Sequence, residues 1–225
     1  MPRGYFITGT DTDVGKTRVS LALLSALQRK GYSTIAMKPV ACGCISKEGI
    51  YQNDDAVKLQ QQASVHIPYE LVNPYALPAP IAPHLAAAKN GQHIDIDRIR
   101  QIHHQQQNKA DYIVMEGVGG WLVPLNAHDT TADMVKALEM PVILVAGIRL
   151  GCLNHALLTH AAIRERGIPL IAWVANCIDK DCLEIEDNIE TLRGRLDAPL
   201  LGIIPYMEKH DVQTIADCLD IGMLI

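Results

Sequence analysis

Short aliphatic runs alternate with longer amphipathic stretches along most of the chain. The runs that predict β-strands are Tyr5–Thr8, Thr34–Val40, Asp111–Glu116, Pro141–Gly147, Pro169–Ala175 and Leu200–Ile204. Strands that are aliphatic on both faces are typical of a parallel sheet covered by helices on both sides. We therefore expect an α/β fold with a mostly parallel sheet of about seven strands.

The amphipathic stretches between these runs predict helices. The first spans Lys16–Lys30 and precedes Gly31, a residue that favours helix termination. Within it, Val19, Leu23 and Leu27 recur at helical spacing and form one apolar face. The other predicted helices are Asp54–Gln62, His84–Asn90, Asp95–Asn108, Thr131–Leu138, Leu153–Arg166, Cys182–Leu196 and Val212–Leu219.

No repeat, linker or shift in composition divides the chain, so we expect one domain over residues 1–225. The segment Leu71–Pro83 holds four prolines and predicts an extended, ordered loop. We interpret His103 and His104 as part of a solvated helix face. Adjacent residues on a helix diverge by about 100°, which argues against a shared ligand site for the two.

Composition and charge exclude several classes of protein. Hydrophobic residues make up 48% of the chain, too much for a disordered protein, and the net charge of −5 argues against nucleic-acid binding. The sequence shows neither an apolar signal segment nor a run of the roughly 18–20 apolar residues that span a membrane. The six cysteines lack the paired spacing of a zinc site. We therefore expect a cytoplasmic protein that binds neither nucleic acid nor a membrane.

The first predicted strand is followed by the sequence GTDTDVGKT at positions 9–17. Phosphate-binding loops commonly have the form G-x4-G-K-[ST], and here one extra residue separates the two glycines. In such a loop, backbone N–H groups and the N-terminus of the next helix bind phosphate. Lys16 suits the β- and γ-phosphates, and the Thr17 hydroxyl suits Mg²⁺. The position between a strand and a helix favours a nucleotide site over an ordinary glycine-rich turn.

Polar residues follow other predicted strands at the same edge of the sheet, where ligands bind in open α/β folds. Glu116 ends one strand before a run of glycines, and its two interpretations are a metal ligand and a solvated charge. Asp54 and Asp55 precede a helix, and spacing alone does not separate a metal ligand from a helix cap there. Lys38 follows an inner strand, which is unusual unless its amine points into a site. Asn176 suits contact with a base or the capping of a turn.

These motifs occur together in the order typical of one known family. The stretches that carry the resemblance are Gly9–Thr17, Lys38–Val40, Asn73–Tyr75, Pro83–His84, Glu116–Trp121, Gly151–Ala156, Trp173–Asn176 and Ala198–Pro205. From the first strand to about Pro205, the chain resembles the dethiobiotin synthetases, the ATP-dependent ligases of biotin biosynthesis. This resemblance implies a P-loop NTPase-like fold, Mg²⁺ with ATP as co-substrate, and a homodimer.

The resemblance also implies a reaction. Its substrates are 7,8-diaminononanoate (7,8-diaminopelargonate), CO2 or bicarbonate, and ATP. In this family CO2 carbamylates one amine, the carbamate takes the γ-phosphoryl group, and the second amine closes a ureido ring as phosphate leaves.

The resemblance also implies roles for individual residues. The Mg²⁺ ligands are matched by Thr17, Asp55 and Glu116, which selects Asp55 over Asp54. The catalytic positions are matched by Lys16, Lys38 and Thr12, with Lys38 near the carbamate. Nucleotide contacts are matched by Asp13, Val14, Gly15, Lys16, Thr17, Arg18, Asp55, Glu116, Gly117, Val118, Gly119, Asn176, Cys177, Pro205, Tyr206 and Met207. Substrate contacts are matched by Thr12, Lys38, Cys42, Leu150, Gly151, Cys152 and Asn154, the last four in a segment that meets the substrate carboxylate across the dimer interface.

Three positions depart from the family pattern. Cys42 stands where a Ser commonly contacts the substrate, and a thiol is a weaker hydrogen-bond donor. Arg149 replaces a frequent Lys, and Asn188 stands near where a Tyr approaches the substrate carboxylate. Such changes would tune substrate affinity or mark a paralogue with a shifted substrate.

Two other classes share the phosphate loop. Partition and septum-site ATPases carry a lysine inside the loop, at the position of Asp11 here, which counts against that alternative. Amidating synthases with a similar N-terminal domain need a further glutaminase domain, for which 225 residues leave no room. The ligase is therefore the function that the sequence favours.

Overall fold

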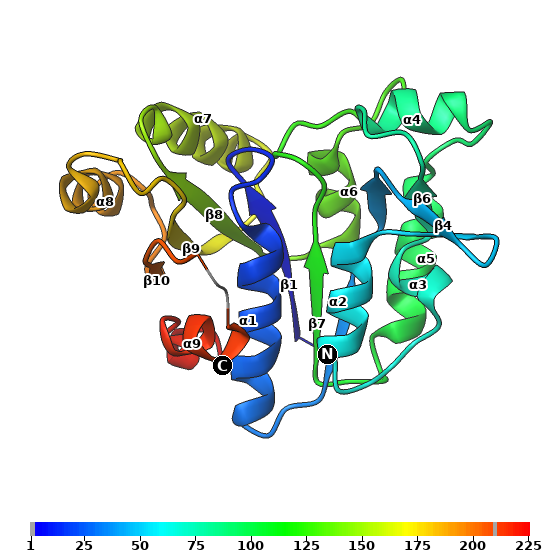
Figure 1. Cartoon of the computed structure of the whole chain (residues 1–225), viewed down its shortest axis with the longest axis horizontal. Helices are drawn as coiled ribbons and strands as arrows, with labels where there is room; N and C mark the ends of the chain where they lie inside the picture. The colour runs from blue at the N-terminus through cyan, green and yellow to red at the C-terminus, as the bar shows by residue number, and fades with distance from the viewer. Residues whose placement is uncertain (1–2, 209–210) are drawn as a thin grey trace.

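The computed structural model describes residues 3–208 and 211–225. Its centre is a sheet of six strands, all parallel, in the order β10-β9-β8-β1-β7-β2 (Figure 1). The strands are β1 (Arg3–Gly9), β2 (Thr34–Met37), β7 (Tyr112–Glu116), β8 (Val142–Ile148), β9 (Leu170–Cys177) and β10 (Leu200–Ile204). The expected α/β fold with a parallel sheet is confirmed.

The expectation of about seven strands in this sheet is wrong by one. The predicted strand Thr34–Val40 divides at Pro39, which has no N–H to donate to a ladder. The N–H of Lys38 already bonds outside the sheet, to the carbonyl of Val72 at 2.9 Å. The chain therefore leaves the main sheet, and the four remaining strands form two small sheets. These pair β3 (Val40–Cys42) with β6 (Tyr75–Leu77), and β4 (Ile45–Lys47) with β5 (Ile50–Gln52).

The helices lie close to where the amphipathic pattern predicts them. They are α1 (Lys16–Arg29), α2 (Asp54–Gln62), α3 (Tyr69–Val72), α4 (Pro83–Lys89), α5 (Ile96–Gln106), α6 (Thr131–Leu138), α7 (Cys152–Glu165), α8 (Ile185–Arg193) and α9 (Val212–Asp217), with a 3₁₀ turn at Ile221–Met223. The prediction missed α3, which starts just before the proline-rich segment, and made α8 three residues too long at each end.

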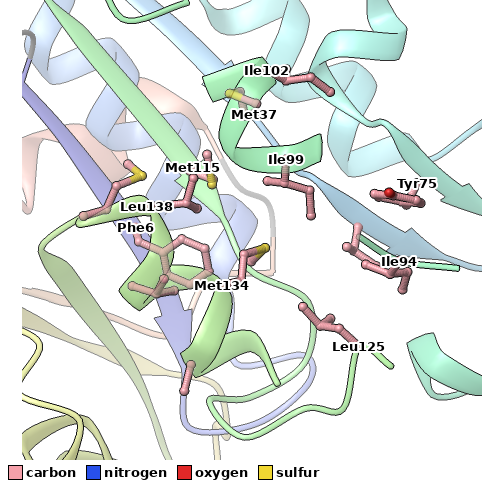
Figure 2. Packing of buried hydrophobic residues seen from close by; sticks show 14 of the residues in the cluster. Phe6, Met37, Tyr75, Ile94, Ile99, Ile102, Met115, Leu125, Met134 and Leu138 are labelled. Atoms are coloured by element: carbon pink, nitrogen blue, oxygen red, sulfur yellow. The ribbon is translucent and has the colours of Figure 1, made fainter. Parts of the chain in front are cut away.

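Both faces of the sheet are covered, because neighbouring residues of each strand point to opposite sides. On one face, Phe6 packs with Met115 and with Ile99 and Met134 of α5 and α6 (Figure 2). On the other, Ile7 packs against the apolar face of α1. Methionine and isoleucine side chains thus fill the core around the single Phe of the chain.

His103 is buried rather than solvated, contrary to the sequence interpretation. Its side chain lies on the inner face of α5 and is 4% exposed, whereas its neighbour His104 is exposed. Burial lowers the pKa of His103 to about 4, with a smaller contribution from the nearby His104. Helix periodicity does separate the two rings, as expected, but it directs the His103 ring into the core.

The parallel arrangement places the polar strand ends on one edge of the sheet. The loop between β1 and α1 lies at this edge (Figure 1). Glu116 ends the neighbouring β7, where it is in register with Ile7 of β1, and Lys38 follows β2. The next strand on the other side, β8, leads into Arg149. In the described part of the chain, no helix has the length and hydropathy needed to cross a membrane.

Candidate active site

The phosphate loop joins β1 to α1 through a left-handed turn. Gly15 has φ 92°, and a Cβ at this position would collide with the amide nitrogen of Asn176. Only glycine therefore fits here. That nitrogen also donates to the carbonyl of Val14 at 2.8 Å, so a side chain of β9 holds the loop in place. Gly15 is the N-cap of α1 and has no side chain that could cap the helix. The first N–H groups of the helix are therefore available to bind an anion.

Lys16 is held inside the loop. Its Nζ donates to the carbonyl of Asp11 at 2.9 Å, and its residue is 7% exposed. Burial lowers the pKa of Lys16 to about 8, since the carboxylates of Glu116 and Asp13 only partly compensate for the lost solvation. An anionic ligand would restore the missing counter-charge.

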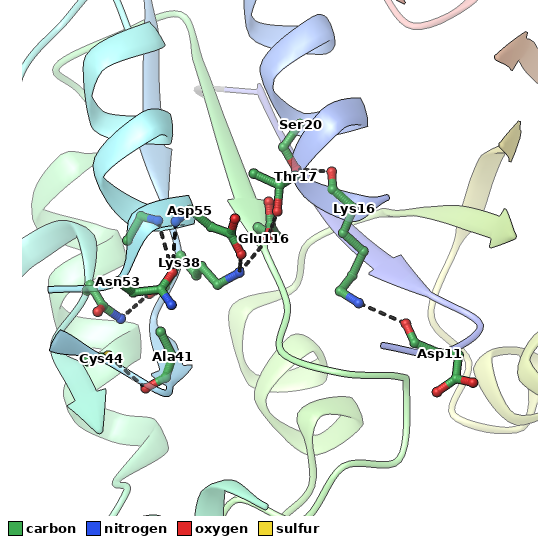
Figure 3. A network of polar contacts seen from close by, with 12 residues as sticks. Asp11, Lys16, Thr17, Ser20, Lys38, Ala41, Cys44, Asn53, Asp55 and Glu116 are labelled. Atoms are coloured by element: carbon green, nitrogen blue, oxygen red, sulfur yellow. Dashed lines mark hydrogen bonds and ion pairs between the residues drawn. The ribbon is translucent and has the colours of Figure 1, made fainter. Parts of the chain in front are cut away.

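A cluster of opposite charges lies beside the loop (Figure 3). Nζ of Lys38 donates to Oε1 of Glu116 at 2.6 Å and to Oδ2 of Asp55 at 2.9 Å. Burial alone would lower the pKa of Lys38, but the two carboxylates outweigh it and raise this pKa above the ordinary value. Lys38 in turn holds the pKa of Asp55 below its usual range, although burial opposes this. Lys38 and Asp55 are therefore both ionised at neutral pH.

Local hydrogen bonds fix this cluster in place. The Asn53 side chain caps α2 by accepting from the N–H groups of Asp55 and Ala56, which orients the first turn of the helix. Asn73 donates to the carbonyl of Lys38 at 2.7 Å. Asp54 lies outside the cluster, because its exposed carboxylate faces Lys47 at 3.8 Å. Within this stretch, Asn53 therefore caps the helix and Asp55 forms the ion pair with Lys38.

The oxygen atoms of three side chains around this cluster suit a hard cation. The Thr17 hydroxyl donates to Oε1 of Glu116 at 2.9 Å, and Asp55 is joined to the same Glu116 oxygen through Nζ of Lys38. The other oxygen of Glu116 is fully buried and has no hydrogen-bond partner among the described residues. Two carboxylates and a hydroxyl that converge in this way fit the oxygen ligands that Mg²⁺ prefers.

A second ion pair lies on the other side of the phosphate loop. Nη2 of Arg149 donates to Oδ2 of Asp11 at 2.8 Å, and the other carboxylate oxygen accepts from the N–H of Thr12 at 2.7 Å. The carbonyl of Arg149 accepts from the N–H of Cys152, the first residue of α7. Arg149 therefore contacts both the phosphate loop and the turn that begins α7.

A cleft of about 1330 Å³ opens over the phosphate loop and the charge cluster. It is larger than most single-ligand pockets and has room for a nucleotide and a second substrate. The predicted residues that line it are Thr12, Asp13, Gly15, Lys16, Thr17, Arg18, Lys38, Cys42, Asp55, Glu116, Val118 and Gly119. Burial raises the pKa of the Cys42 thiol, so this side chain is neutral in the cleft.

The remaining predicted residues do not line this cleft. Five of them are buried: Val14, Gly117, Cys152, Asn176 and Cys177. The thiols of Cys152 and Cys177 pack in the core, so these two residues can contact a ligand only through their main chain. Exposed or partly exposed residues away from the cleft lining are Leu150, Gly151, Asn154, Pro205, Tyr206 and Met207. Leu150 is 96% exposed.

Several residues of the cleft were missed by the sequence analysis. They are Asp11, Asn53, Lys58, the proline-rich stretch at 80–83, the stretch at 122–124, and Val212 with Ile215 of α9. For Asp11 the sequence offered a signal, because it lies inside the glycine loop. The others come from loops and helices whose approach to the cleft depends on tertiary packing.

Comparisons with known proteins find relatives along nearly the whole chain. The AAA domain family matches residues 3–214. The ATP-dependent dethiobiotin synthetase BioD of Nitrosospira multiformis is 48% identical over 224 residues, which cover 100% of this chain and 97% of that protein. The enzyme of the same name from Cellvibrio japonicus is 45% identical, with 99% and 98% coverage.

Solved structures with a similar fold are more distant in sequence. The septum site-determining protein MinD of Pyrococcus horikoshii, complexed with Mg-ADP, has a TM-score of 0.57 and 17% identity, covering 91% of this chain and 82% of that one. A ParA family ATPase of Chlorobium tepidum has a TM-score of 0.58 and 15% identity, with 96% and 94% coverage. These likenesses show the P-loop fold alone. The identity and coverage of the curated relatives show more: the chain belongs to the family of ATP-dependent dethiobiotin synthetases.

Proposed function

We propose that this protein converts 7,8-diaminononanoate, CO2 and ATP into dethiobiotin, ADP and phosphate. The observation that carries this proposal is the position of a buried lysine, Lys38, between two carboxylates beside a phosphate loop, in a cleft large enough for two substrates. This arrangement suits a reaction in which an organic anion attacks a nucleotide phosphate.

The proposed reaction has three steps. One substrate amine adds to CO2 and loses a proton, which gives a carbamate. A carbamate oxygen then attacks the γ-phosphorus of ATP, ADP leaves, and a carbamic–phosphoric anhydride results. The second amine attacks the carbonyl carbon, the bond from that carbon to the phosphate oxygen breaks, and the ureido ring closes.

Phosphoryl transfer depends on positioning and on neutralisation of charge. Lys16 and the N–H groups at the start of α1 would bind the ATP phosphates. Lys38, whose ammonium is already fixed by two carboxylates, would offset negative charge that develops on the carbamate. Thr12 is exposed at the mouth of the loop and would face the reacting groups.

We further propose that Thr17, Asp55 and Glu116 hold Mg²⁺. The donor set supports this, because it combines two carboxylates with a hydroxyl and leaves one buried carboxylate oxygen of Glu116 without a hydrogen-bond partner among the described residues. When bound, Mg²⁺ would neutralise charge on the β- and γ-phosphate oxygens. The protein contributes the fixed positions of these oxygens, set by the cap of α2 and the end of β7.

The nucleotide base is proposed to lie near Asn176 and the segment that follows β10. The amide nitrogen of Asn176 is engaged by the loop, but its buried Oδ1 has no partner among the described residues. A free acceptor suits the amino group of adenine. Arg18, Cys177, Pro205, Tyr206 and Met207 would complete this end of the site, as the family pattern suggests.

The substrate carboxylate is proposed to bind the segment Leu150–Asn154 of a second copy of the chain. Support for contact with a second copy comes from exposure, because Leu150, Leu158 and Leu183 present large apolar side chains on and around α7 and α8.

We also propose that residues 1–225 act as a single ligase domain, and that this domain works in the cytoplasm, where ATP is available.

A direct assay tests the proposed function. Purified protein would receive the diamine, bicarbonate, Mg²⁺ and ATP, while dethiobiotin and phosphate are measured together. We expect the two products in equal amounts and only when the diamine is present. ATP hydrolysis that is indifferent to the diamine would overturn the proposal and favour an ATPase switch.

A further inference from the structure

Asp11 introduces a negative charge where the site must accept a triphosphate. Its carboxylate lines the cleft and lies in the same loop as Lys16, whose ammonium is bound by the Asp11 carbonyl. An unpaired carboxylate there would repel a polyanion, since charges a few ångströms apart interact strongly near a protein surface. The charge therefore requires compensation for ATP to bind well.

Arg149 supplies that compensation from the residue directly after the neighbouring strand β8. It bonds to Asp11 at 2.8 Å, and within the described part of the chain it does not itself line the cleft. The side chains of Arg149 and Asp11 are 40% and 46% exposed, so the pair is open to solvent and adds little to folding stability. Its position suggests a role in the site instead.

The same arginine also connects two parts of the site. Its carbonyl accepts from Cys152 at 3.0 Å and so closes the turn at the start of α7. Thr10, next to Asp11, is tied to the same strand, because its N–H donates to Val145 of β8 at 3.0 Å. The phosphate loop and the Leu150–Asn154 segment are thus joined through β8 and Arg149.

We propose that Arg149 is a positioning residue for the ATP phosphates. It acts through Asp11, by neutralising this carboxylate and by holding the loop that presents Lys16. This inference rests on the proposed function, because it concerns the same ATP site. It explains why a permanently charged guanidinium at position 149 suits a loop that carries an aspartate at position 11.

The test is a double-mutant cycle on the full-length enzyme. In Arg149→Gln the aspartate is left unpaired, and we expect the KM for ATP to rise about fivefold, with a smaller change in kcat. Adding Asp11→Asn removes the uncompensated charge. The double variant should then return to within about twofold of the Asp11→Asn single variant. High salt should reduce the effect of Arg149→Gln, because the repulsion is screened.

A second surface pair provides the matched control. Arg29 and Asp217 form an ion pair of 2.6 Å with a similarly exposed arginine, at the far end of α1. Arg29→Gln should leave the KM for ATP unchanged. The melting temperature of each variant shows whether it folds.

Two outcomes would overturn the proposal. If the two single effects multiply in the double variant, Arg149 acts independently of Asp11, for example by direct contact with substrate. If Arg149→Gln leaves the KM for ATP unchanged, the pair has no role in ATP binding. Both results require that the wild-type protein makes dethiobiotin, and a wild type without that activity contradicts the proposed function instead.

Discussion

At the scale of single residues, Lys38 shows how one buried charge serves both folding and chemistry. Its side chain is 8% exposed, and that of its partner Glu116 is fully buried. A buried carboxylate that loses its partner is destabilising by about 3 kcal/mol or more. The lysine therefore stabilises the strand end at which the proposed reaction takes place.

Lys38→Met should affect turnover and stability together. We expect kcat to fall by about 100-fold, because the ammonium proposed to offset carbamate charge is gone. Chemical unfolding in a chelating buffer should show a loss of about 3 kcal/mol, and adding Glu116→Gln should recover part of it. Lys47→Met is the control, since Lys47 faces Asp54 in solvent. An unchanged kcat in Lys38→Met would contradict the role of the lysine.

Cys42 tests the one departure from the family pattern that lies in the cleft. Its thiol is neutral and donates hydrogen bonds weakly. Cys42→Ser should therefore keep activity or lower the KM for the diamine, as steady-state kinetics would show. A large loss of kcat would instead give the thiol a role of its own. Cys44→Ser is a useful comparison, because Cys44 is buried outside the cleft lining.

At the scale of secondary-structure elements, helix caps position the proposed metal ligands. Asn53 caps α2, and Asp55 is the second residue of that helix. Loss of such a cap costs about 1 kcal/mol and loosens the first helical turn. In α2, that turn carries a proposed Mg²⁺ ligand.

Asn53→Ala should therefore lower stability by about 1 kcal/mol and also raise the Mg²⁺ concentration needed for half-maximal activity. Asp95→Ala is a matched control, because Asp95 caps α5 in the same way, away from the cleft. It should cost similar stability without changing the Mg²⁺ requirement. If both variants need the same Mg²⁺ concentration for half-maximal activity, the Asn53 cap does not position a metal ligand and the prediction is wrong.

Elements also show what the sequence could predict. The six strands of the main sheet and most helices followed from local periodicity, and the phosphate loop from a local motif. The pairing of β3 with β6 could not be predicted, because it depends on the exit of the chain at Pro39. The ion pair between Asp11 and Arg149 joins residues 138 positions apart, and only the order of β1 and β8 in the sheet brings them together.

At the scale of the whole molecule, one edge of the sheet carries the proposed active site, while the core beneath it determines stability. His103 belongs to that core. Its pKa of about 4 lies below the ordinary 6.5, so the unfolded chain binds a proton more readily between these values. Stability from this residue is thus complete above pH 6.5 and declines as the pH falls towards 4.

This difference predicts a measurable pH dependence of folding. Between pH 7 and pH 5, the wild type should lose about 2 kcal/mol of unfolding free energy through His103 alone. His103→Gln, which keeps a polar side chain but cannot titrate, should show a loss smaller by that amount. His104→Gln should keep most of the dependence, because this neighbouring ring is exposed. Urea unfolding at both pH values compares the three proteins, and parallel curves for wild type and His103→Gln would show that the buried imidazole is not the group that titrates.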